Sequence, residues 1–289
     1  MDVLAHYSRD EVKREIWEFS RSRWVALHVK EGGALIRYQG QKPLTISTPD
    51  DVVELVRRYS ARTIYCTANL YQRLEVREDV YDATNVWACT PTWDIDNRVE
   101  DWRATLAAVE AISSFLEKLG VARSVYAKWS GEGCHLHIHH LAVSSEVRRK
   151  YGALDVAYAI VEYVLGKLRA ELEEIAAKHD ALELRVDNEM DPQRLFTAPL
   201  SLHRKLNAAC VCFDPDEASS FDLSWTSPSR FRHRSLWNRF VEGEADELAE
   251  KAIEVVGPYP WRKRRAHRKH PPLDKQIMRW ISGDAQRDS

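Results

Sequence analysis

Length, composition and charge describe a globular protein and exclude several other classes. The 289 residues are 44% hydrophobic and 30% charged, and the formal net charge of -2 points to no polyanionic partner. Five cysteines without a CxxC pair, and an N-terminus charged from its second residue, argue against a disulfide framework, a signal peptide and a membrane span. We therefore expect a cytoplasmic protein, nucleoid-associated in a prokaryote.

The first part of the chain predicts a unit of helices and strands. Ser8 and Glu11 form a capping box before an apolar stripe, and Thr48 caps a second helix with Pro49 in its first turn. The expected elements, in order, are a helix at 9–20, a hairpin of strands 24–29 and 34–38 joined by the turn at 31–33, a helix from 49, and a strand at 63–71.

The middle of the chain alternates strands with longer helices. Gly120 closes one amphipathic helix, and Ser144 or Ser145 caps a long helical region. The expected elements are a strand containing 92–96, a helix to 119, strands 124–129 and 135–143, helix to about 178, a strand at 182–187 and a helix at 244–256. This pattern predicts an α+β (mixed α/β) fold, with a boundary at Gly257-Pro258 before a basic tail.

The strand Thr-Trp-Asp-Ile-Asp, residues 92–96, carries the first chemical signal. Side chains alternate along a strand, so Asp94 and Asp96 project from the same face, about 6.6 Å apart along the chain. Carboxylates at this spacing suit a site with two divalent ions. Alternatively, the pair is two exposed aspartates at a strand end.

The stretch SGEGCHLHIHH, residues 130–140, carries the second. In an extended strand His135, His137 and His139 share one face, while Ser130 and the glycines form the turn that enters it. A hydroxyl, backbone amides and an imidazole at a strand mouth suit a phosphate group. The alternative interpretation is that His139 and His140 are partly exposed strand residues without such a role.

The third signal lies in RVDNEMDPQRLFTAPLSLHRK, residues 185–205. It places a carboxylate, Asp187, at a strand end and follows it with donors suited to phosphate. Asp191 is a rival acid, but only Asp187 ends a plausible strand. Three strand-borne acids and two groups of phosphate donors fit metal-dependent chemistry on a nucleoside triphosphate.

In this order the three segments resemble the motifs of the archaeo-eukaryotic primase superfamily. The resemblance covers roughly residues 8–210, on TWDID, SGEGCHLH and RVD with RLFTAPLSLHRK. It implies an RRM-like catalytic sheet at about 86–213 beside an N-terminal αβ unit at about 1–85, in a catalytic domain of 1–256 followed by a basic tail at 257–289. It also implies template-directed addition of an NTP or dNTP to a 3′-hydroxyl, as in a DNA primase or primase-polymerase.

The resemblance also assigns roles to individual residues. Asp94, Asp96 and Asp187 would bind two Mg²⁺ or Mn²⁺ ions and carry catalysis; His137 matches a motif histidine without an assigned role. The residues implied for the nucleotide are Ser130, Gly133, His135, Arg194, Ser201, His203 and Lys205. DNA template and primer are the implied partners, with a large primase subunit or repair proteins as further ones.

Two features depart from the family. Glu132 stands where members often have a basic residue, which removes one expected cationic contact to phosphate. Cys210 and Cys212 are the only cysteines near a position for a zinc knuckle, and one intervening residue is not the usual spacing of zinc ligands, so zinc is not expected.

Other functions remain open at this point. An end-joining or damage-bypass polymerase of the same superfamily would use the same core. The run from His135 to His140 also resembles a histidine-triad nucleotide hydrolase or transferase, in which a histidine is the nucleophile. A non-catalytic nucleic-acid-binding module is the third possibility, and the basic run WRKRRAHRKH, residues 261–270, is either a solvated tail or a contact to phosphates.

Overall fold

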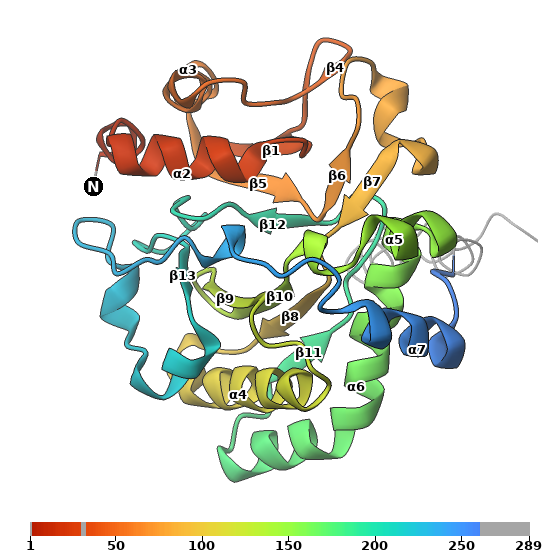
Figure 1. The fold of residues 1–289 in the computed structure, drawn as a ribbon. Helices are drawn as coiled ribbons and strands as arrows, with labels where there is room; N and C mark the ends of the chain where they lie inside the picture. Colours follow the sequence, from red (N-terminus) through yellow and green to blue (C-terminus); the bar gives the residue numbers. More distant parts are fainter. Residues whose placement is uncertain (1, 30–32, 261–289) are drawn as a thin grey trace, which may run out of the picture. The chain divides into compact units, whose positions relative to one another are not determined.

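The computed structural model describes residues 2–29 and 33–260, and those up to residue 258 belong to one compact unit (Figure 1). The predicted turn at 31–33, apart from Gly33, and the basic run at 261–270 lie outside the described residues. Within the described part of the chain, no helix is long and apolar enough to cross a membrane.

The N-terminal elements form a four-stranded antiparallel sheet with helices beside it. Its strands lie in the order β12-β5-β1-β2, so the late strand β12 returns to pair with β5. The bounds are α1 Val3–Tyr7, α2 Asp10–Ser20, β1 Val25–Val29, β2 Leu35–Ile36, α3 Pro49–Tyr59, β5 Ala61–Thr67 and β12 Leu195–Thr197. The predicted hairpin of β1 and β2 is confirmed.

The two predicted helix caps had different outcomes. Thr48 and Asp51 form the capping box of α3, with Pro49 as its first residue, as predicted. The Ser8 box is wrong: Arg9 is the N-cap of α2 and makes no side-chain cap bond. Ser8 instead ends the unpredicted helix α1, and its hydroxyl donates to Leu4 O.

The predicted strand at 63–71 is divided at Ala68 between two sheets. Ala68 N donates to Arg194 O and Ala68 O accepts from Thr90 N, so the chain changes partners there. After β5 the chain forms a short antiparallel pair, β6 Asn69–Tyr71 with β7 Val86–Cys89. A second short pair, β3 Tyr38–Gln39 with β4 Lys42–Pro43, lies between β2 and α3.

The second sheet is antiparallel and has five strands in the order β11-β8-β10-β9-β13. The sequence β8–α4–β9–β10–α6–β11 is the β-α-β-β-α-β order of a ferredoxin-like unit. The bounds are β8 Thr92–Asp96, α4 Trp102–Lys118, β9 Val125–Trp129, β10 Cys134–Ile138, α5 Ser145–Tyr151, α6 Ala153–Lys178, β11 Arg185–Asp187, β13 Val211–Phe213 and α7 Asp246–Val256. The predicted α+β fold with an RRM-like sheet is confirmed.

The two faces of this sheet have different environments. Trp93, Ile95 and Leu136 are fully buried on the face covered by α4 and α6, where the Trp93 indole donates to Val161 O. The opposite face looks toward β12 (Figure 1). The rings of His135 and His137, on this face, both contact Phe196 of β12. The polar residues of the three motifs are therefore enclosed between the two sheets or lie at their edge.

Two predicted boundaries moved. β10 ends at Ile138 rather than 143, because His139 N donates to Ser124 O and the chain turns into a short helix that His139 caps. His139 is 5% exposed and stacks on Phe240, with ring centroids 4.5 Å apart, so the prediction of a partly exposed strand residue is wrong for it. The long helical region is interrupted at Gly152, which has φ of +91°.

Candidate active site

A row of polar side chains crosses the five-stranded sheet at one level. The register pairs Asp187 with Asp94, Asp94 with His135, His135 with Lys128 and Lys128 with Cys212. Directly opposed residues on antiparallel strands project from the same face, with Cβ atoms about 5 Å apart. We call Asp94, Asp96 and Asp187 the acid cluster, and Lys128 with Cys212 the amine end of the row.

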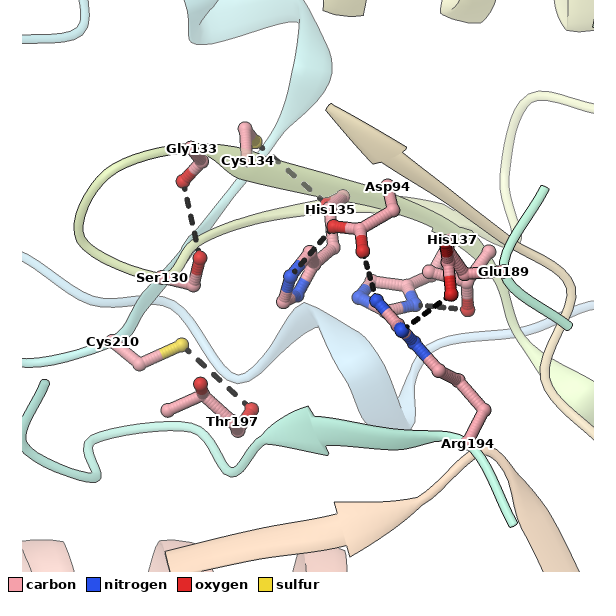
Figure 2. Close-up of polar contacts among 11 residues, drawn as sticks. Asp94, Ser130, Gly133, Cys134, His135, His137, Glu189, Arg194, Thr197 and Cys210 are labelled. Carbon is pink, nitrogen blue, oxygen red and sulfur yellow. Dashed lines mark hydrogen bonds and ion pairs between the residues drawn. The ribbon is translucent and has the colours of Figure 1, made fainter. Parts of the chain in front are cut away.

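Asp94 is the buried member of the acid cluster and is 6% exposed. One of its carboxylate oxygens accepts from His135 Nε2 at 3.2 Å, and the other pairs with the Arg194 guanidinium (Figure 2). Burial alone would raise the pKa of Asp94, but His135 and Arg194 outweigh it and hold that pKa below its usual value. Asp94 is thus an ionised carboxylate at neutral pH.

Asp96 and Asp187 lie at the exposed end of the same face. Asp187 is opposite Asp94, and Asp96 is two residues along β8 on the same side. Burial and then the negative charge of Asp94 raise the pKa of Asp96, with a smaller contribution from Asp187. The register of β11 and β8 thus places the three predicted acids on one face, at the same end of the sheet.

The rival acid Asp191 has a different role. Its carboxylate accepts from Gln193 N at 2.7 Å and so stabilises the turn that leads into β12. Because Asp187 has the register partner in β8 and Asp191 does not, the strand assignment favours Asp187.

The acid cluster fits divalent cations by its donor chemistry. Carboxylate oxygens are the ligands of Mg²⁺ and Mn²⁺, and three of them share one face at the open edge of the sheet. As the side chains stand, no three His, Cys, Asp or Glu groups within residues 2–29 and 33–260 converge as a ready metal site, since Asp94 is turned toward Arg194. The three carboxylates are therefore suitable ligands for divalent cations, and in this structure the Arg194 guanidinium balances the charge of Asp94.

Cys210 and Cys212, the two cysteines considered for a zinc site, are both buried free thiols. Burial raises the pKa of Cys210 to about 12 and that of Cys212 well above its ordinary value. Protonated thiols beside the Lys128 amine are poor ligands for a metal.

Arg194 joins the two sheets at the acid cluster. It immediately precedes β12, and its guanidinium reaches Asp94 and also Glu189, whose carboxylate is 2.7 Å away (Figure 2). Arg194 was predicted to bind nucleotide; here it is engaged by two acids, and Glu189 is a contact that the motifs did not indicate.

His137 is an internal residue. Its Nδ1 lies 2.8 Å from the Thr92 hydroxyl, and its ring stacks on Tyr126 at 4.7 Å. Burial lowers the pKa of His137 far below its usual value, so it is neutral. Two buried imidazole nitrogens, His137 Nε2 and His135 Nδ1, have no hydrogen-bond partner in the structure.

The glycine-rich turn, residues 130–133, is fixed by close contacts. Ser130 N donates to Gly133 O at 2.9 Å, and the Trp129 indole donates to Gly131 O at 3.0 Å. A Cβ on Gly133 would lie 2.2 Å from Ile95 O, so only glycine lets β10 approach β8 here. The Ser130 hydroxyl, half-buried, also donates to Gly133 O at 3.3 Å.

The segment 203–206 packs directly on this turn. A Cβ on Gly131, whose φ is +133°, would lie 2.6 Å from the His203 ring. The chain arrives through Leu200, a buried residue with φ of +60°, which is strained backbone for a leucine. We call residues 130–133 and 203–206 together the cradle; it unites two of the predicted groups of phosphate donors.

The predicted nucleotide residues differ in how free they are to bind. Lys205 is exposed and His203 is 8% exposed, so both border solvent at the cradle. Ser201 is fully buried: its hydroxyl accepts from Ile64 N at 2.8 Å and lies 3.0 Å from the Tyr7 hydroxyl. Ser201 therefore fixes the loop to the first sheet, and its hydroxyl already has hydrogen-bond partners within the protein.

Lys128 is the residue that the motif analysis missed. It is fully buried, its Nζ has no hydrogen-bond partner, and it lies 5.0 Å from the centre of the Phe19 ring. Burial, opposed only by weak attraction to nearby thiols, lowers the pKa of Lys128. A lysine in an otherwise apolar strand, two residues before the Ser130 turn, was the available signal.

The arrangement of histidines does not favour a histidine-triad enzyme. His139 has left the strand, while His135 and His137 are buried and hydrogen-bonded to Asp94 and Thr92. A nucleophilic imidazole must instead reach the phosphorus atom of its substrate.

Comparisons with known proteins support the fold. No family model and no curated protein matches the sequence. Among solved structures, the polymerase domain of Mycobacterium tuberculosis Ligase D, determined in complex with DNA, is similar with a TM-score of 0.52 and 14% sequence identity. The match covers 89% of this chain and 88% of that chain. The chain thus has the primase-polymerase fold expected from its three motifs.

Proposed function

We propose that the protein is a metal-dependent, template-directed nucleotidyltransferase that adds an NTP or dNTP to a nucleic-acid 3′-hydroxyl. The observation that carries this proposal is the register of β11 and β8, which sets Asp187 opposite Asp94 with Asp96 on the same face. The cradle lies at the adjoining end of β10, because Gly133 contacts Ile95 O between the two aspartates. The carboxylates that could bind cations therefore lie next to the donors that could bind phosphates.

The chain's own residues have separable tasks in this proposal. Asp94, Asp96 and Asp187 would hold Mg²⁺ or Mn²⁺, which when bound would activate the 3′-hydroxyl and neutralise the charge on the leaving pyrophosphate. His203 and Lys205, with backbone amides of the turn, would orient the triphosphate for in-line attack. His135 would keep Asp94 ionised and correctly oriented, through its hydrogen bond of 3.2 Å.

DNA template and primer are the proposed polynucleotide partners. The fold of a polymerase domain determined in complex with DNA supports this choice over a mononucleotide substrate alone. Damage bypass and end joining use the same chemistry, so substrates with a lesion or with short complementary ends would separate these pathways from priming.

The test is incorporation of labelled nucleotide on a primed template, with Mn²⁺, Mg²⁺ or EDTA. We expect incorporation that requires a divalent metal and disappears in Asp94→Asn, which preserves the size of the buried side chain. Incorporation by the Asp94→Asn, Asp96→Asn double variant at the wild-type rate would reject the proposal. Binding of DNA without any incorporation by the wild type would favour a non-catalytic binding module instead.

A further inference from the structure

Glu132 is an acid placed among the cations of the cradle. Its carboxylate lies 3.8 Å from His203 Nε2 and 3.7 Å from the Arg204 guanidinium. These distances are longer than hydrogen bonds, so the contacts are electrostatic. The Glu132 side chain is 42% exposed and the Arg204 side chain 48% exposed, so the carboxylate can leave this position without disturbing the core.

The His203 imidazole and the Arg204 guanidinium face Glu132, and the fold holds the His203 ring and the backbone that carries both residues. His203 Nδ1 accepts from Leu206 N at 2.9 Å, which leaves the Nε2 side of the ring toward Glu132. Arg62 donates to His203 O and to Leu206 O, both at 2.8 Å, and so fixes the backbone of the segment. The contact between Gly131 and the His203 ring fixes the opposite side.

The cradle therefore presents a fixed anion position, and a carboxylate occupies it. Carboxylate and phosphate oxygens are recognised by the same cationic donors. Glu132 also influences His203: burial lowers the pKa of that imidazole, and the Glu132 charge opposes the shift. A phosphate that enters must displace the carboxylate and then remain beside its negative charge.

We infer that Glu132 is a specificity-determining residue that selects metal-complexed nucleoside triphosphates and rejects metal-free polyphosphates. The inference rests on the proposed function for the identity of the ligand. A triphosphate that carries a divalent cation has roughly two fewer negative charges than the free anion, so it is repelled less by a nearby carboxylate. Product pyrophosphate that has lost its metal would also be repelled by this carboxylate, which would favour its release.

The test compares two ligands on the full-length protein by calorimetry: pyrophosphate in EDTA, and the magnesium complex of ATP. We expect Glu132→Gln to tighten pyrophosphate binding about tenfold and magnesium-ATP binding by no more than about threefold. Glu132→Asp, which keeps the charge, should retain the wild-type preference. Glu110→Gln, on α4 at the far side of the sheet, is the matched control and should change neither affinity.

The binding measurements test the role of Glu132, and primer extension tests the proposed function. Equal changes for both ligands, or no change in Glu132→Gln with an unaltered melting temperature, would overturn the inference. Primer extension by the wild type is measured separately. If extension fails while Glu132→Gln still tightens pyrophosphate selectively, the proposed function falls and the anion selectivity stands; if extension succeeds without that selectivity, only this inference falls.

Discussion

The acid cluster and the amine end belong to one face of one sheet, yet their surroundings are opposite. Asp96 and Asp187 border solvent, and the third acid, Asp94, is matched by Arg194 and His135. Lys128 is sealed under Phe19 and Phe196, with no acid as a partner. Ionised groups that a ligand can reach are available for chemistry, whereas a sealed amine contributes chiefly through its protonation state and its packing.

The largest expected effect comes from the acid cluster. Asp187→Ala should reduce metal-dependent incorporation at least about 100-fold, because it removes one carboxylate of the acid cluster. Asp187 is exposed, and its negative charge contributes to raising the pKa of Asp96, so its removal should not lower the melting temperature. Glu183→Ala, an exposed acid just before β11, is the control and should behave as the wild type in both assays.

The next effect concerns the cradle. Gly131→Ala would push a Cβ into the His203 ring, and we expect nucleotide affinity to fall about tenfold and stability by about 1 to 2 kcal/mol. Gly120→Ala is a matched control, since Gly120 also has positive φ, +83°, but has open space around its Cβ position. It should lose stability and keep its affinity for nucleotide; equal loss of affinity in both variants would contradict the role of His203.

Acid sensitivity should trace to the buried histidines outside the site. Burial, with smaller contributions from Arg23 and Arg148, lowers the pKa of His139 to about 3 from 6.5. The unfolded chain therefore binds one more proton between these values, so this group's contribution to stability is complete above pH 6.5 and is lost as the pH falls toward 3. Its slope is at most about 1.4 kcal/mol per pH unit.

Urea unfolding of the wild type and His139→Asn between pH 4 and 7 measures this slope. Asparagine can still accept from Leu141 N, as His139 Nδ1 does. The variant should be less stable at pH 7, because it loses the stacking on Phe240, and should lose less stability on acidification. Parallel curves for the two proteins would show that His139 does not titrate as described.

The smallest effect is expected at the amine end. Lys128→Met should raise the unfolding free energy by about 1 kcal/mol at pH 7, because it replaces an unpartnered buried amine by an apolar chain of similar length. The folded-state pKa is lowered, so the wild type should gain stability as pH rises toward 10.5 and the variant should gain less. Lys118→Met, at an exposed position, should change stability by no more than about 0.5 kcal/mol. Destabilisation by Lys128→Met would reveal a partner for this amine.

Local patterns predicted those features whose partners lie close in sequence. The alternation of side chains placed Asp94 and Asp96 on one face, and the spacing of Thr48 and Asp51 placed the start of α3. The capping box at Ser8 had the right spacing, but the helix before it used Ser8 as its own terminus. A pattern of four residues does not show whether its serine begins the following helix or ends the preceding one.

Features that depend on distant partners were not readable from these patterns. β12 pairs with β5 across more than a hundred residues, and this pairing brings Arg194 to Asp94. Ser201 was assigned to phosphate from its motif, whereas Tyr7 and Ile64 engage its hydroxyl in the fold. The end of β10 at Ile138 likewise depends on Ser124, the residue just before β9, whose carbonyl accepts from His139 N.

The most direct test of the central claim is the location of Mn²⁺ in crystals grown with a non-hydrolysable nucleoside triphosphate, by anomalous scattering. The account predicts manganese bound by carboxylate oxygens of Asp94 and Asp187, with the triphosphate in the cradle and Arg194 moved off Asp94. A nucleotide bound elsewhere, or manganese absent from these aspartates while nucleotide fills the cradle, would contradict it.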